Sequence, residues 1–188
     1  MLDQPSEQVI QKALVQCGLN SSGASVIYED YLRSIEVVIK PEADAISEQF
    51  GCIRQAVGDA IVSFSDPDMD RQYRAFVNEL LRPKALEDAR QSLQKLGRLT
   101  NFPVRSAYSS DKLFAEAIEM HCGVPKGKAL KEFDGHIAFM PPQEEYRDNG
   151  KFLALYECLT AGIIYVAATR ELTITLIGNE ALREQSSE

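Results

Sequence analysis

The side chains that carry most metal and nucleophile chemistry are scarce in this chain of 188 residues. It contains 2 histidines, 4 cysteines and no tryptophan. The two histidines, His121 and His136, are not one helical turn apart, so they cannot form the HExxH motif of a zinc protease. A di-iron helical bundle needs paired Glu-x-x-His motifs, and these are missing as well. The sequence therefore excludes both of these common metal centres.

Closely spaced cysteines are also missing. Cys17, Cys52, Cys122 and Cys158 are separated by 35, 70 and 36 residues, whereas zinc sites and redox motifs place two thiols within a few residues. Three of the four occupy apolar positions of periodic segments, which is typical of core cysteines. Residues 1–6 are polar, carry no Lys or Arg and predict no secretory signal. We therefore expect four reduced, buried thiols and a cytoplasmic protein.

Long apolar runs and an excess of positive charge are absent too. The densest apolar stretch, 161–168, has 8 residues, fewer than half of those that a membrane-spanning helix needs. There are 20 Lys and Arg against 28 Asp and Glu, which gives a net charge of −8. Because this charge repels phosphate and anionic lipid, we expect no direct contact with nucleic acid or membrane.

The chain does contain enough apolar residues, 45%, to build a conventional core. Helical periodicity dominates the first two thirds, most clearly in one stripe with steps of three and four. Its members are Ile46, Phe50, Ile53, Val57, Ile61 and Phe64. Near the C-terminus, β-branched residues in 163–168 and 172–177 predict two adjacent strands.

These patterns predict an α+β fold in which five or six amphipathic helices precede a small antiparallel sheet near the C-terminus. We expect one compact domain, 1–188, with a helical part at about 1–123 and a sheet-containing part at about 130–178. We find no internal repeat in the sequence. A chain of this mass is long enough to bury such a core without metal ions or disulfides.

Three segments fit more than one structure. Residues 24–40 have helical spacing, which we favour, although Ile35, Val37 and Ile39 also alternate as in a strand. For the stripe after Glu42 we favour one helix that continues to Phe64, and the main alternative is a break at Gly58 followed by a strand at 60–64. Residues 151–160 fit a helix or a strand equally well.

Asp66, Asp68 and Asp70 form the one acidic cluster that suggests chemistry. Alternating carboxylates supply the oxygen ligands that Mg²⁺ and Ca²⁺ prefer. Acidic residues at the start of a helix also satisfy its free N–H groups, and Pro67 suits the first helical position. We favour the helix cap and keep the three carboxylates as the candidate metal ligands. We expect no cofactor.

Since no common catalytic constellation is present, we favour a binding protein over an enzyme. The acidic charge predicts a protein-binding module that recognises a basic protein partner, such as an inhibitor or an immunity or antitoxin-like protein. Two alternatives stay open. One is a metal-dependent hydrolase or phosphotransferase that uses Asp66, Asp68 and Asp70, and the other is a structural subunit of a homo-oligomer.

Overall fold

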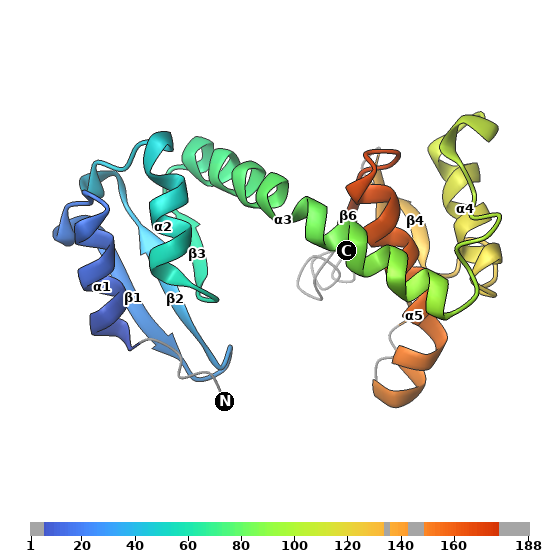
Figure 1. Cartoon of the computed structure of the whole chain (residues 1–188), viewed down its shortest axis with the longest axis horizontal. Helices are drawn as coiled ribbons and strands as arrows, with labels where there is room; N and C mark the ends of the chain where they lie inside the picture. The colour runs from blue at the N-terminus through green and yellow to red at the C-terminus, as the bar shows by residue number, and fades with distance from the viewer. Residues whose placement is uncertain (1–5, 134–135, 143–148, 177–188) are drawn as a thin grey trace, which may run out of the picture. The chain divides into compact units, whose positions relative to one another are not determined.

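The computed structural model describes residues 6–133, 136–142 and 149–176, which contain five α-helices and six β-strands (Figure 1). This confirms the α+β class, including an antiparallel pair of strands near the C-terminus. The chain divides into two compact units, Met1–Leu81 and Arg82–Glu188, which we call the first and second units. Each unit has its own sheet and core, so a helical part followed by a sheet part does not describe the chain.

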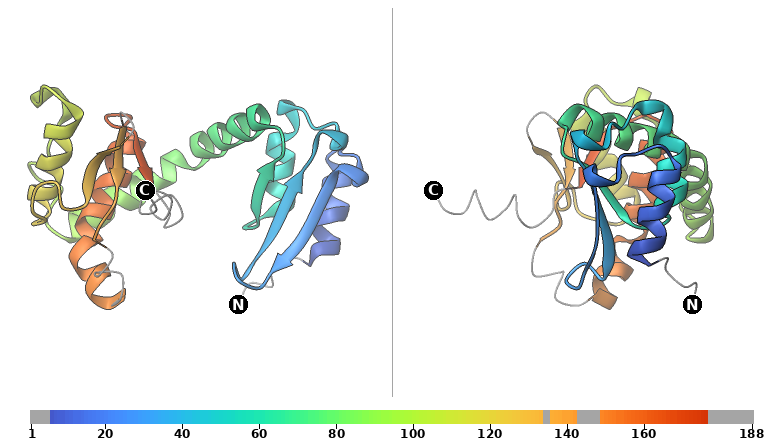
Figure 2. Two further views of the ribbon diagram at one scale, coloured as in Figure 1. Left: turned by 180° about the vertical axis from the view of Figure 1, so that it is seen from behind. Right: turned by 90° about the vertical axis from the view of Figure 1, so that its left-hand side faces the viewer.

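The first unit places two helices on one side of a three-stranded sheet (Figure 2). Its elements are α1 (Glu7–Gln16), β1 (Ala24–Glu29), β2 (Ser34–Ile39), α2 (Phe50–Val57), β3 (Ile61–Phe64) and the first half of α3 (Pro67–Lys95). β2 is the central strand, antiparallel to β1 and parallel to β3. Apolar residues of β2, α1, α2 and α3 meet in a core between the sheet and the helices.

Two expectations for the first unit are corrected. Residues 24–40, for which we favoured a helix, form the β1–β2 hairpin, because Ile35, Val37 and Ile39 alternate and all three are buried against the helices. The stripe after Glu42 breaks at Gly58, whose φ of 57° suits glycine, and the chain continues as β3.

The second unit contains the other half of α3, which runs on through Pro83, and a second three-stranded sheet. Its further elements are α4 (Asp111–His121), β4 (Leu130–Phe133), β5 (His136–Phe139), α5 (Asn149–Ala168) and β6 (Ile174–Leu176). The central strand β5 is antiparallel to β4 and parallel to β6. The strand expected at 172–177 is therefore observed as β6.

Residues 163–168 were predicted as a strand and instead end helix α5, which also contains the ambiguous 151–160. The buried residues of this helix recur at steps of three and four, as in a helix that packs on one side. The larger ones are Tyr156, Leu159, Ile163 and Val166, and the small residues Ala161 and Ala168 are buried beside them. Packing of this stripe outweighs the preference of β-branched residues for strands.

The two units repeat one topology, which the sequence analysis missed. Apart from α3, the first unit runs α1–β1–β2–α2–β3 and the second runs α4–β4–β5–α5–β6, with the same strand order and directions. In each, the first helix ends at a Cys-Gly pair whose glycine has positive φ, 90° at Gly18 and 75° at Gly123. The next N–H then reaches back five residues, from Leu19 to the Leu14 carbonyl and from Val124 to the Glu119 carbonyl, as in a Schellman motif.

All four cysteines form disulfides, so the expectation of reduced core thiols is wrong. Cys17 is bonded to Cys52, and Cys122 to Cys158, with Cα–Cα distances of 5.6 and 5.4 Å. The first bond joins the end of α1 to α2, and the second joins the end of α4 to α5. Disulfides are rare in cytosolic proteins, so the thiols no longer support a cytoplasmic location. None of the described helices combines the length and apolarity needed to cross a membrane.

Candidate functional site

Asp66 caps helix α3. Its carboxylate accepts hydrogen bonds from the backbone N–H of Asp68 at 2.9 Å and of Met69 at 2.8 Å. Asp68 points to solvent and pairs with Arg71, one turn further along the helix. Two of the three candidate metal ligands therefore serve the start of this helix.

Asp70 connects α3 to strand β3. One carboxylate oxygen accepts from the Phe64 N–H at 3.1 Å, and the other accepts from Arg74 Nε at 2.5 Å. Burial acts to raise the pKa of Asp70, but the hydrogen bonds from Arg74 and Phe64 outweigh it, so the pKa lies below its ordinary value. All three carboxylates have protein partners, and across the described ranges no three His, Cys, Asp or Glu side chains converge as metal ligands.

We expect Asp66→Ala to cost about 0.5–2 kcal/mol of stability, because two N–H groups at the start of α3 lose their acceptor. Thermal unfolding of the wild type should be unchanged by added Mg²⁺ or Ca²⁺. A rise of several degrees with either ion that disappears in Asp68→Ala would contradict the cap and restore the metal site.

His121 and the cysteines make contacts that support the fold. His121 Nε2 lies 2.6 Å from the Arg98 carbonyl oxygen, and its ring packs edge-on against Phe102. Cys122, the neighbour of His121, is bonded to Cys158 and offers no thiol. His136 is exposed at the start of β5. Because all four cysteines are in disulfides, none offers a thiol that a histidine base could activate.

Among the described residues of the first unit, no helix covers one face of the sheet, and we call it the open face (Figure 1 and Figure 2). It consists of the strand residues that share one side of the sheet: Ser25, Ile27, Glu29, Ser34, Glu36, Val38, Ile61 and Ser63. Ile27, Glu36 and Ile61 form a row across β1, β2 and β3. The two isoleucines are 50% and 43% exposed, so the row presents two apolar side chains on either side of a carboxylate.

The outer edges of this sheet are partly blocked. At the edge of β1, Glu7 accepts from the Tyr28 N–H at 2.6 Å, and Gln11 donates to the Ala24 carbonyl at 3.3 Å. At the edge of β3, Asp70 occupies the Phe64 N–H. Because these side chains use the backbone groups that an added strand would need, the open face is the more accessible surface.

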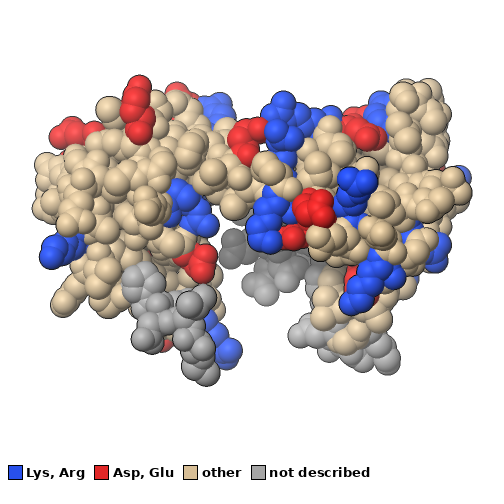
Figure 3. All heavy atoms as spheres, viewed as in Figure 1, with Lys and Arg blue, Asp and Glu red and all other residues tan. Residues whose placement is uncertain are grey.

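The negative charge of the protein belongs to the first unit. Residues 1–81 contain 13 acidic and 6 basic residues, a net charge of −7, whereas residues 82–188 contain 15 and 14, a net charge of −1. On the side seen in Figure 3, acidic and basic side chains lie next to one another in several places, with uncharged surface around them. Net charge therefore distinguishes the two units, although they share a topology.

The second unit has an apolar groove between α5 and its part of α3, with a volume of about 800 Å³. Ala89 lies on the α3 side, and Phe152 and Ile164 lie on the α5 side. Asp88 and Glu157 are the charged residues of its lining. The described lining of this groove thus combines apolar side chains with two acidic groups.

Comparison of the chain with models of protein families, with curated proteins and with solved structures finds no match. Sequence reasoning named the acidic cluster and missed the open face. The signal was present in β2, where buried Ile35, Val37 and Ile39 alternate with Glu36 and Val38, as expected for a sheet covered on one side.

Proposed function

We propose that this chain is a protein-binding module whose first unit recognises a basic protein partner through the open face. The observation that carries the proposal is the row Ile27–Glu36–Ile61, in the unit that holds a net charge of −7. Such a row suits an amphipathic segment that places a Lys or Arg between two apolar side chains. Binding without catalysis agrees with the structural surroundings of the histidines and cysteines.

Charge and apolar contact would contribute at different stages of binding. The acidic unit steers a basic partner and raises the association rate. Burial of the two isoleucines then slows dissociation, because apolar area removed from water contributes about 25 cal/mol per Å². An inhibitor or an immunity-type protein directed at a basic enzyme is the form of this function that the charge favours. The two disulfides favour an oxidising compartment over the cytoplasm.

The test is capture of the partner from a native extract, followed by binding kinetics at increasing salt. Between 0.1 M and 1 M salt the screening length falls from about 10 Å to about 3 Å. We expect the association rate to fall by about tenfold or more and the dissociation rate to change less. Glu36→Lys should slow association, and a double substitution of Ile27 and Ile61 by Ser should speed dissociation.

Ile164→Ser is the matched control, since this exposed isoleucine lies on α5 of the second unit. It should bind as the wild type does. A captured partner that binds equally to all variants, or at a rate indifferent to salt, would contradict the proposal. Self-association of the wild type that is lost in the Ile27 and Ile61 variant would favour the homo-oligomer. Tight binding of nucleic acid at physiological salt would contradict the inference, drawn from the acidic charge, that the partner is a basic protein.

A further inference from the structure

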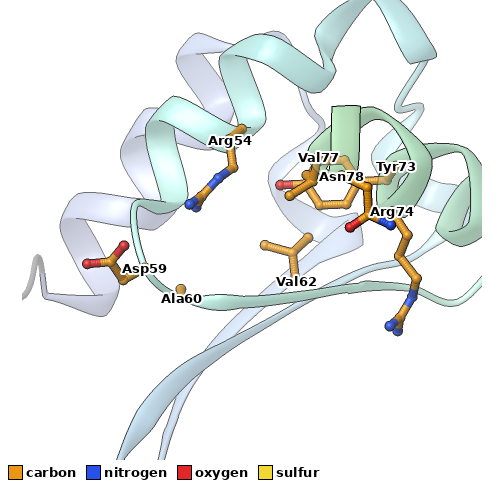
Figure 4. A pocket seen from close by; sticks show the side chains of 8 residues that line it. All are labelled: Arg54, Asp59, Ala60, Val62, Tyr73, Arg74, Val77 and Asn78. Atoms are coloured by element: carbon orange, nitrogen blue, oxygen red, sulfur yellow. The ribbon is translucent and has the colours of Figure 1, made fainter. Parts of the chain in front are cut away.

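A cavity of about 370 Å³ lies in the first unit between α2, β3 and α3 (Figure 4). It is on the helix-covered side of the sheet, because Val62 lines it while its neighbour Ile61 belongs to the open face. Ala60, Val62 and Val77 form apolar wall, and Arg54, Tyr73 and Asn78 bring polar groups. The cavity is thus separate from the surface to which we assign the partner.

Tyr73 is the unusual member of this lining. The residue is 4% exposed, and its hydroxyl is buried without any hydrogen-bond partner. Its ring packs against Phe50 and Phe64, each at 5.3 Å between ring centroids, which holds the ring in place. In Figure 4 the hydroxyl points to the side where the Arg54 guanidinium lies.

The Tyr73 hydroxyl is therefore a fixed hydrogen-bond donor. Burial raises the pKa of Tyr73, and the positive charge of Arg54 only partly opposes this, so the hydroxyl keeps its proton at neutral pH. A buried donor without an acceptor carries an uncompensated desolvation cost. An acceptor atom brought by a ligand would remove that cost.

Arg54 supplies the positive charge. It donates to the carbonyl of Gly58, a neutral group, which holds the guanidinium beside the cavity. Within the described part of the chain it has no carboxylate partner within 4.0 Å. Arg74, the other cation of the lining, is paired with Asp70 at 2.5 Å and turns away from the other side chains in Figure 4. One uncompensated cation thus faces the cavity.

We propose that this cavity binds a small organic monocarboxylate, with the carboxylate between the Arg54 guanidinium and the Tyr73 hydroxyl. A planar guanidinium and a hydroxyl donor match the two oxygens of such a group. The apolar body of the ligand lies against Ala60, Val62 and Val77. Asp59 at the same cavity adds a negative charge, which disfavours dianions such as phosphate.

The experiment is titration calorimetry of the full chain with benzoate and isovalerate, with benzamide as the neutral match for benzoate. We expect millimolar binding of the carboxylates and at least about tenfold weaker binding of benzamide. N-acetylvaline distinguishes a free metabolite from a chain terminus, since tighter binding of N-acetylvaline would identify the latter. Absence of saturable binding by all three carboxylates, or tighter binding of inorganic phosphate, would overturn the proposal.

Tyr73→Phe is the decisive variant, because it removes only the hydroxyl. We expect it to weaken benzoate binding by about fivefold or more while the melting temperature stays equal or rises, as the unpartnered hydroxyl contributes nothing to the unliganded fold. Arg54→Gln should abolish binding. Arg71→Gln, which removes a charge from the same unit outside the cavity, should bind as the wild type. Unchanged benzoate affinity in Tyr73→Phe would refute the site even if Arg54→Gln does not fold.

Discussion

The double substitution Cys17→Ala and Cys52→Ala is expected to lower the free energy of unfolding of the first unit by about 4 kcal/mol. The disulfide closes a loop over a sequence separation of 35 residues, so without it the unfolded chain gains conformational entropy. Replacing both residues avoids an unpaired thiol. Because the chain has no tryptophan, amide hydrogen exchange in rising denaturant, read by peptide, is the measurement that follows each unit by itself.

The second unit provides the matched experiment. The double substitution Cys122→Ala and Cys158→Ala should lower the free energy of unfolding of the second unit by a similar amount, since its disulfide closes a loop over a separation of 36 residues. Each double variant should leave exchange in the other unit unchanged. Four reactive thiols in denatured wild type without reductant, or two double variants as stable as the wild type, would show that the bonds do not form.

Replacement of Glu119 by leucine should destabilise the second unit by about 3–5 kcal/mol. Glu119 is 0% exposed and accepts three backbone hydrogen bonds, from Gly127 at 2.5 Å, Ala129 at 2.7 Å and Leu130 at 2.8 Å. These bonds hold the loop between α4 and β4. A leucine would leave the three N–H donors without their acceptor, and local hydrogen exchange at 127–130 would report the loss.

Comparison with the equivalent position of the first unit shows which interaction Glu119→Leu would remove. Leu14 occupies the same position in the first unit, also buried, five residues before the end of the Schellman motif. There the corresponding loop is held by Gln11, whose amide donates to the carbonyls of Ser21 and Ala24, both at 3.3 Å. The Schellman motif therefore tolerates a leucine at this position. The loss of stability in Glu119→Leu would come from the three missing hydrogen bonds.

Glu119→Gln and Glu116→Leu complete this series. The glutamine keeps one carbonyl oxygen and should lose roughly half as much stability as the leucine. Glu116 lies on the same helix and pairs with Lys126 at 3.9 Å, at the limit of an ion pair, so its replacement should cost less than about 1 kcal/mol. A Glu119→Leu variant as stable as Glu116→Leu would contradict the role assigned to the buried carboxylate.

Local rules determined several elements from sequence alone. Asp66 and Pro67 begin a helix, and Gly18 and Gly123 end one, because caps and positive φ depend on a few neighbouring residues. Strand β6 falls within the predicted 172–177 for the same reason. The α+β class follows from such local signals added along the chain, and the net charge of −8 is independent of folding.

Tertiary structure decided wherever two local patterns competed. Residues 24–40 carry both a helical and an alternating pattern, and pairing of β2 with β1 and β3 against the covering helices selects the strand. Residues 163–168 form a helix instead of the predicted strand, because α5 buries a helical stripe in the core of the second unit. Both outcomes depend on which face can be buried, which no short window of sequence contains.

The functional surfaces depend on the same long-range contacts. Ile27, Glu36 and Ile61 form a row only because three strands align, and Arg54 meets Tyr73 only where α2 packs beside α3. The similar spacings of the cysteines, 35 and 36 residues, were visible in the sequence. A disulfide needs Cα atoms about 4.4–6.8 Å apart, and separation along the chain does not determine distance in space.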